Sequence, residues 1–147
     1  MIVPSGPLII KSEQETNRHR WDNGGARMER RGMDMARLIA FYSRAGENYF
    51  GGQYRTVTVG NTEKVANQIA EAVGGTLFPI RQKVPYAVAY ETCIRQAKAD
   101  QQANARPELA DLPGSLDGYE EIYLGYPNYW GDMPYLFVKS SVALNLS

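Results

Sequence analysis

Cysteine and histidine are almost absent from this sequence, and an excess of charge of either sign is absent altogether. Among 147 residues there is one cysteine, Cys93, and one histidine, His19. A single cysteine excludes an internal disulfide. One cysteine and one histidine are too few for the usual protein metal sites, which need several such ligands. Sixteen basic residues balance sixteen acidic ones, so no strong field draws the chain to nucleic acid or to an anionic membrane. The cysteine content fits a reducing, cytoplasmic location.

Long hydrophobic runs are also lacking. The apolar run near the start, Pro7 to Ile10, is too short for the core of a signal peptide. No stretch approaches the roughly 20 apolar residues that span a bilayer. We therefore expect no membrane partner. The length fits one compact domain, and 44% hydrophobic with 22% charged residues is ordinary for a soluble one.

Residues 1–35 are predicted to be a disordered polar leader, followed by a domain over 36–147. Polar residues dominate this segment and no hydrophobic period persists, so it offers too little apolar area to offset its ordering entropy. The alternative is a basic targeting arm, but its six basic residues face five acidic ones. Translation starting at Met33 or Met35 in place of Met1 is a further alternative.

After residue 35 the pattern becomes that of an α/β domain. The apolar run Leu38 to Tyr42 predicts a strand buried on both faces. Val65, Ile69 and Val73 lie four apart, which predicts a helix over 62–73 that Asn61 or Thr62 can cap. Further elements are predicted as strands over 76–80 and 121–125, a helix over about 88–103, and a small hairpin arm over 54–59.

The alternation of strands and helices predicts parallel pairing with right-handed crossovers. Pro79 lacks an N–H group, so the second of these three strands is expected at an edge of the sheet. With the first strand between the other two, the expected order is 2-1-3.

The loop that joins the first strand to the first helix can bind a phosphate. A helix N-terminus offers unpaired N–H groups and a partial positive charge, and Ser43, Asn61 and Thr62 add short polar groups. Taken alone, these residues are better explained by ordinary helix capping. The loop has no Gly-Lys-Ser/Thr and no Gly-x-Gly-x-x-Gly, which excludes a Walker loop and a dinucleotide fingerprint.

A second loop follows the third strand and runs from Gly125 to Pro134. It lies where open α/β sheets bind ligands, outside the carboxyl ends of strands beside the first one. Tyr129 and Trp130 can offer flat faces to a flat ring, with Gly131 leaving backbone N–H groups accessible. The alternative is that these aromatic residues cap the core.

Together the two loops resemble those of the flavodoxin-like family of FMN proteins. The family's phosphate loop is here split, with Ser43-Arg44-Ala45-Gly46 beginning it and Gly60-Asn61-Thr62 completing it around an insertion. With the segment Gly125 to Gly131, the pattern is similar to a bacterial flavodoxin-like subgroup. The resemblance implies a three-layer parallel sheet and FMN as cofactor, and it implies these cofactor-binding residues: Ser43, Arg44, Ala45, Gly60, Asn61, Thr62, Pro127, Asn128, Tyr129, Trp130 and Gly131.

The resemblance leaves a gap at the C-terminus. A flavodoxin-like sheet has five strands in the order 2-1-3-4-5, whereas this sequence supplies three, so we expect an incomplete, C-terminally truncated domain. Pro134 can start a helix, after which the sequence stops at Ser147. The third strand would then be an open edge that invites self-association, and the chain would be marginally stable and bind FMN weakly or not at all.

Three functions compete at this stage. The first is an FMN protein that transfers electrons to a redox partner protein or reduces a small acceptor, with the chemistry supplied by the flavin. The second is an interaction-only fragment that pairs through its open edge. The third, a hydrolase, lacks a nucleophile with a plausible base. No residue is identified as catalytic, and enzyme activity stays open.

Overall fold

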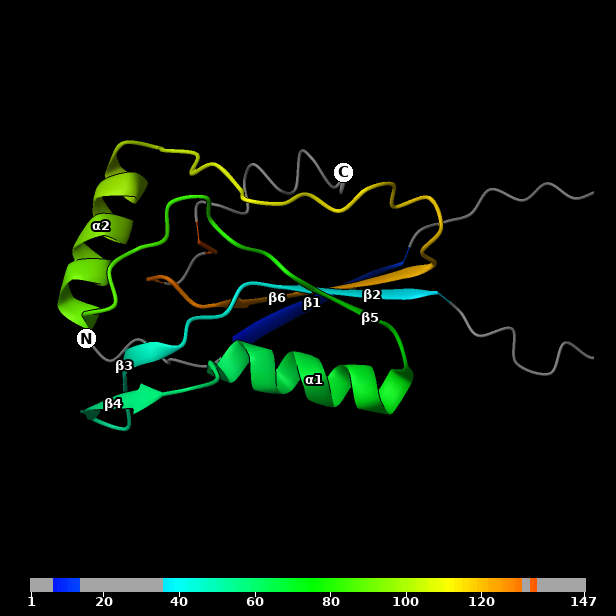
Figure 1. Cartoon of the computed structure of the whole chain (residues 1–147), viewed down its shortest axis with the longest axis horizontal. Helices are drawn as coiled ribbons and strands as arrows, with labels where there is room; N and C mark the ends of the chain where they lie inside the picture. The colour runs from blue at the N-terminus through cyan, green and yellow to red at the C-terminus, as the bar shows by residue number, and fades with distance from the viewer. Residues whose placement is uncertain (1–6, 14–35, 131–132, 135–147) are drawn as a thin grey trace, which may run out of the picture.

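The computed structural model describes residues 36–130 and 133–134, together with the backbone of residues 7–13. Four strands come first in the chain, and from β4 onward strands and helices alternate (Figure 1). The elements are β1 Pro7–Glu13, β2 Arg37–Phe41, β3 Gly46–Phe50, β4 Gln53–Val57, α1 Asn61–Val73, β5 Thr76–Pro79, α2 Tyr90–Gln102 and β6 Glu121–Pro127.

The main sheet has the order β1-β6-β2-β5. β2 pairs in parallel with β5 on one side and with β6 on the other. This confirms the parallel arrangement and the 2-1-3 order that the alternation of elements predicts. β5 pairs only with β2 among the described strands, as expected for a strand that ends in Pro79, whose ring nitrogen has no hydrogen to donate to a neighbour.

β1 corrects the expectation of a disordered leader at Pro7–Glu13. This segment pairs antiparallel with β6 over its full length, from Pro7 opposite Pro127 to Glu13 opposite Glu121. β6 therefore has a partner on both sides, and the prediction that its far edge lies open is wrong. The physical reason is that a strand edge presents a row of unpaired N–H and C=O groups, which any nearby extended segment can satisfy. The rest of the expected leader, and the helix expected after Pro134, lie outside the described residues.

The two faces of the sheet are covered in different ways. On one face Ile39 and Phe41 of β2 pack with Ala66 of α1. On the other, Leu38, Ala40 and Ile122 join a larger cluster that the segment between α2 and β6 covers. Figure 1 shows α1 along the first face and this segment across the second, with α2 at one end. β2 thus contributes alternate residues to two cores, which explains its continuous apolar run.

The insertion in the first loop forms a two-stranded antiparallel sheet. An arm is expected over 54–59, and the structure has the strand β4 there, at Gln53–Val57. Its partner is β3, with Gly46 opposite Val57 and Phe50 opposite Gln53. The side chain of Glu47 accepts a hydrogen bond from the Tyr90 backbone N–H at 2.7 Å, and the Tyr54 hydroxyl bonds Glu91. These contacts fix the hairpin against the first turn of α2.

Candidate functional site

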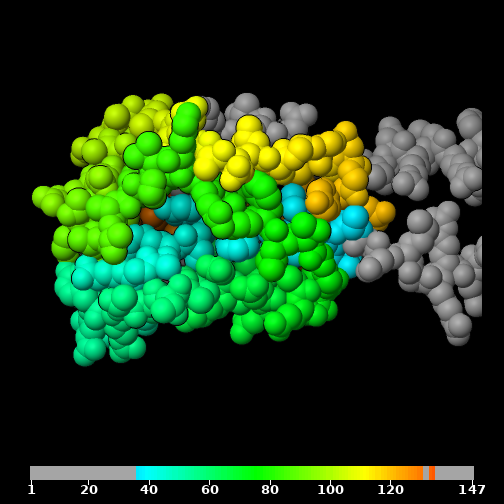
Figure 2. Space-filling model, in the orientation of Figure 1, coloured from blue at the N-terminus to red at the C-terminus, as the bar shows by residue number. Residues whose placement is uncertain are grey.

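A cavity opens where the carboxyl ends of β2 and β6 meet the β3–β4 hairpin and α2. It holds about 190 Å³ of space for water-sized groups. In Figure 2 it is the hollow between α2 and the hairpin. One end, the helix end, is lined by Ser43, Asn61 and Thr62, and the other, the aromatic end, by Pro127, Asn128, Tyr129 and Trp130. The fold thus brings together the two loops that the sequence singles out.

The helix end depends on a very close approach of two chain segments. A Cβ atom placed on Gly60 would lie 2.2 Å from the Ser43 Oγ and 2.6 Å from the Arg44 carbonyl oxygen, far inside van der Waals contact. Ser43 Oγ in turn accepts a hydrogen bond from the Glu63 backbone N–H at 3.0 Å. Ser43 therefore caps α1 across a gap of twenty residues in sequence, and only glycine fits at position 60.

This arrangement corrects the prediction that Asn61 or Thr62 caps the helix. The N-cap residue is Gly60, which has no side chain that could accept a hydrogen bond from the helix. The Glu63 N–H is bonded by Ser43, and the Lys64 N–H donates to the Gly60 carbonyl at 3.1 Å. Within the described part of the chain, no partner is assigned to the N–H groups of Asn61 and Thr62, the two at the very start of α1. Two backbone donors and the positive end of the helix dipole are thereby left for an anion.

The Arg44 side chain is held by backbone carbonyl groups of three residues. Its guanidinium donates to the carbonyl oxygens of Glu47, Ala87 and Val88, and it lies 5.9 Å from the centre of the Tyr90 ring. These bonds tie the loop after β2 to the segment before α2. Arg44 also lines the cavity, so its positive charge makes the electrostatic potential there more positive. Its N–H groups meanwhile donate hydrogen bonds to the backbone.

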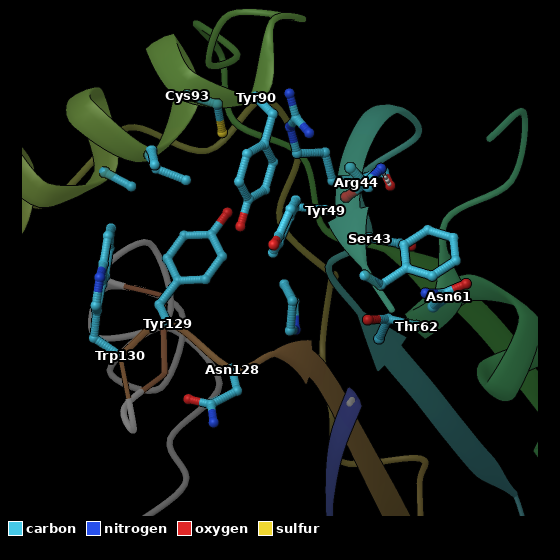
Figure 3. Close-up of a pocket in the computed structure, with 15 residues that line it drawn as sticks. Ser43, Arg44, Tyr49, Asn61, Thr62, Tyr90, Cys93, Asn128, Tyr129 and Trp130 are labelled. Carbon is cyan, nitrogen blue, oxygen red and sulfur yellow. Dashed lines mark hydrogen bonds between the residues drawn. The ribbon is translucent and has the colours of Figure 1, made fainter. Parts of the chain in front are cut away.

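The aromatic end holds two rings in an edge-to-face pair. The centroids of Tyr129 and Trp130 are 6.0 Å apart with the ring planes at 73°, and Figure 3 shows both side chains on the same side of the cavity. Lys98 of α2 lies 5.2 Å from the centre of the Trp130 ring. Trp130 has φ of 50°, a left-handed conformation that a bulky residue rarely adopts. Strain of this kind concentrates at functional sites, and Trp130 lines the cavity while its side chain stays 40% exposed.

The cavity also uses residues that the sequence reading did not identify. They come from the hairpin inserted in the first loop and from α2, which is distant from both loops in sequence. These residues are Asn48, Tyr49, Phe50, Tyr90, Cys93, Ile94 and Ala97. In Figure 3 Tyr49 and Tyr90 face Tyr129 across the cavity. The sequence signal that could have found them is the cluster of aromatics within the split loop, at Tyr49, Phe50 and Tyr54.

Burial raises the pKa of three titratable side chains in the cavity wall or behind it. It raises the pKa of Tyr42 to about 12 and raises that of Tyr129 well above the usual value for a phenol. Burial likewise raises the pKa of the Cys93 thiol, although Arg44 opposes that rise. Arg44 is the one formally charged side chain among the described lining residues. The cavity therefore combines neutral aromatic walls with a positive helix end.

The expected binding residues divide into three groups. Eight line the cavity, namely Ser43, Arg44, Asn61, Thr62, Pro127, Asn128, Tyr129 and Trp130. Ala45 is exposed and Gly60 lies behind Ser43, so neither lines it. Gly131 lies outside the described residues. Within those residues no cluster of three potential metal ligands occurs, and no helix is long and apolar enough to cross a membrane.

Comparison with known proteins agrees with this geometry. The model of a flavodoxin family matches residues 53–142, more than half of the chain. A crystal structure of a protein from Bacteroides uniformis ATCC 8492, named "Putative flavoprotein", is similar with a TM-score of 0.56 and 25% sequence identity. The similarity covers 74% of this chain and 63% of the other, so the chain spans less than two thirds of that protein's length. Comparison with curated proteins gives no match.

Proposed function

Because the chain belongs to the flavodoxin family, we propose that its cavity binds FMN and that the bound flavin transfers electrons to a redox partner protein or to a small acceptor. The observation that carries the proposal is the continuity of the cavity. One space joins an anion-binding helix start at Asn61 and Thr62 to the aromatic rings of Tyr129 and Trp130. A phosphate at one end and a flat ring system at the other are the two recognition elements of FMN.

The residues at the helix end fit a phosphate. Two backbone N–H groups at the start of α1, the hydroxyl of Thr62 and the nearby charge of Arg44 favour an anion without a dedicated basic ligand. Gly60 keeps the loop close enough for Ser43 to hold the helix start in place. The proposed binding role of this end is thus supported by its backbone geometry.

The aromatic end fits the ring. Tyr129 and Trp130 on one wall and Tyr49 and Tyr90 on the other supply apolar faces that would exclude water. FMN would supply the electron-accepting chemistry, and the chain would bind, orient and shield it. No side chain of the cavity is needed as a nucleophile, and the neutral phenols are suited to hydrogen bonding and packing. The free, buried Cys93 fits the proposed cytoplasmic setting.

The alternative of an interaction-only fragment rests on an open edge at β6. In the structure β1 occupies that edge over seven residue pairs. No specific observation therefore favours the alternative over the flavin-binding function. Self-association through that edge would require the displacement of β1.

The test compares ligands that differ only in phosphate. The protein is titrated into FMN and into riboflavin, and binding is followed by the quenching of flavin fluorescence. We expect FMN to bind at least tenfold more tightly, because one charged hydrogen bond with its helix-dipole contribution is worth about 1.5–3 kcal/mol. Thr62→Ala should remove much of that preference. Thr56→Ala, on exposed β4 away from the cavity, is the matched control and should leave it intact.

Equal binding of FMN and riboflavin by the native protein would contradict the assignment of the helix end. Absence of flavin binding at any concentration would contradict the proposed function as a whole.

A further inference from the structure

The wall of the cavity opposite Tyr129 comes from two separate elements. Tyr49 belongs to β3 of the hairpin, and Tyr90 is the first residue of α2. Their ring centroids lie 6.1 Å apart with the ring planes at 31°, and both residues line the cavity (Figure 3). Tyr49 is 43% exposed, so burial alone does not fix its ring against that of Tyr90. The shape of this wall therefore depends on how the hairpin is held against the helix.

The start of α2 receives its cap from the hairpin. The N-cap residue of this helix is Ala89, whose side chain makes no hydrogen bond to the helix. Glu47 of β3 takes its place, because Glu47 Oε1 accepts a hydrogen bond from the Tyr90 backbone N–H at 2.7 Å. A carboxylate suits this position, since its bond is charge-assisted and it lies at the positive end of the helix dipole. The first residue of α2 is thus anchored to β3.

The same strand face carries both the anchor and the ring. Glu47 and Tyr49 are two residues apart in β3, so their side chains point to the same side of the strand. Both meet Tyr90, Glu47 at the backbone N–H and Tyr49 at the ring. Arg44 donates to the carbonyl oxygens of Glu47 and Val88, which also holds the backbone of Glu47 close to the segment before α2. Backbone and side chain of Glu47 are therefore both fixed at this joint.

A further hydrogen bond between the hairpin and α2 is open to solvent. It joins the Tyr54 hydroxyl to Glu91, and both side chains are exposed, so water competes for the two groups. Neither residue lines the cavity. The bond of Glu47 is partly buried and ends on a residue that does line it. Of these two bonds, that of Glu47 is the one placed to control the wall.

We propose that Glu47 is a positioning residue, which sets the ring of Tyr49 against that of Tyr90 and so fixes the wall that faces Tyr129. The inference rests on the proposed function only for the identity of the ligand as a flavin. In that function the ring of the flavin lies at this end of the cavity, whereas its phosphate lies at the start of α1. Loss of the Glu47 bond should therefore weaken binding of the ring and leave the contribution of the phosphate unchanged.

Three variants separate the hydrogen bond from the charge. Glu47→Gln loses the negative charge but keeps a side-chain oxygen that can accept from the Tyr90 N–H. Glu47→Ala loses both the charge and the acceptor. Glu47→Val does the same with a side chain better suited to a strand, and it serves if Glu47→Ala does not fold. Glu47→Gln is the matched control, because its comparison with the other two measures the bond at constant charge.

The first experiment measures the dissociation constants of FMN and riboflavin by the quenching of flavin fluorescence. Relative to Glu47→Gln, Glu47→Ala and Glu47→Val should weaken both ligands equally, by about 3- to 10-fold, the range of one lost hydrogen bond. In protein that also carries Tyr49→Leu, the same comparison should give less than about twofold. An equal loss with and without the Tyr49 ring would overturn the proposal, because a purely structural role is additive. So would a loss confined to FMN.

The second experiment requires no flavin. The two aromatic pairs at the cavity have similar centroid separations, 6.1 Å for Tyr49 and Tyr90 and 6.0 Å for Tyr129 and Trp130. Nuclear Overhauser effects between ring protons are measured for both pairs. The Tyr49–Tyr90 effect should persist in Glu47→Gln and fall at least twofold in Glu47→Ala, while the Tyr129–Trp130 effect stays and reports an intact fold. An unchanged Tyr49–Tyr90 effect in the folded variant would overturn the inference.

The two experiments distinguish failure of this inference from failure of the proposed function. If the native protein binds no flavin and the Tyr49–Tyr90 contact still depends on Glu47, the proposed function fails and the positioning role stands. If flavin binds with a preference for FMN and Glu47→Ala matches Glu47→Gln in both experiments, the proposed function stands and the positioning role fails.

Discussion

The two ends of the cavity are built in different ways. The helix end consists mainly of backbone: two N–H groups at the start of α1, held in place because Gly60 allows Ser43 to come close. The aromatic end consists of side chains, with Tyr129 and Trp130 on a loop and Tyr49 and Tyr90 on other elements. A backbone site tolerates most side-chain changes but fails when the chain path is altered. A side-chain site should lose affinity gradually, one ring at a time.

The largest effect is expected at Gly60. Gly60→Ala places a Cβ atom 2.2 Å from Ser43 Oγ and 2.6 Å from the Arg44 carbonyl oxygen. Relief of that overlap must shift the backbone at the start of α1. We expect a loss of about 1–3 kcal/mol in the free energy of unfolding and at least a tenfold loss in FMN affinity. Urea unfolding and fluorescence titration measure the two quantities.

Two variants sharpen this prediction. Gly114→Ala is the matched control, because an added Cβ there meets no atom within 4 Å, and surface changes of that kind stay within about 0.5 kcal/mol. Combining Gly60→Ala with Ser43→Ala should restore stability only in part, since the overlap with the Arg44 carbonyl remains. A Gly60→Ala protein that unfolds like the native one would show that the close approach is unimportant.

An intermediate effect is expected from alkaline pH through Tyr42, behind the aromatic end. Burial raises its pKa from 10.0 to about 12 in the folded protein, so the folded state keeps the proton that the unfolded chain loses. The stabilisation is fully present below pH 10 and is lost as the pH rises toward 12. At pH 11 the loss is about 1.4 kcal/mol, one pH unit above the unfolded pKa.

Tyr42→Phe provides the comparison for this prediction. Unfolding free energies of both proteins are measured at pH 8 and at pH 11. The free energy of unfolding should fall less between pH 8 and pH 11 in Tyr42→Phe than in the native protein. The difference should be about the 1.4 kcal/mol expected from the Tyr42 phenol. Identical drops would mean that Tyr42 ionises as readily in the folded protein as in the unfolded chain.

The smallest effect is expected at Trp130, and it separates stability from binding. Trp130 has φ of 50°, which costs little for glycine but about 1 kcal/mol or more for other residues. Trp130→Gly should therefore be more stable to urea than Trp130→Ala by about 1 kcal/mol. Both should weaken FMN by about 2- to 10-fold through loss of the ring. A variant pair with equal stability, or with different FMN affinity, would contradict this separation.

Several parts of the fold could be predicted because their signals are local. The apolar run of β2 predicts burial on both faces, and the four-residue spacing of Val65, Ile69 and Val73 predicts α1. Gly60-Asn61-Thr62 and the Tyr129-Trp130 pair predict which loops line the cavity. Parallel strands connected by helices bring their carboxyl ends to one edge, so the meeting of the two loops follows from the order of elements.

Other parts could not be predicted because they join segments far apart in the sequence. The polar surroundings of Pro7–Glu13 favour disorder, and its hydrogen-bond partners among the described residues lie in β6, more than a hundred residues away in sequence. Ser43 caps α1 because Gly60 brings it near, which no capping rule for neighbouring residues includes. Arg44 is drawn to the carbonyl oxygens of Ala87 and Val88 by the position of α2.

By itself the sequence determined the α/β class, the parallel order of three strands and the two loops of the cavity, since each follows from hydrophobic periodicity or from residues close together in the chain. Only the tertiary structure decided that β1 pairs with β6, that the hairpin and α2 form the second aromatic wall, and that Ser43 caps α1. Hydrogen bonds and close packing between distant segments depend on where the chain is in space, and periodicity carries no information about that.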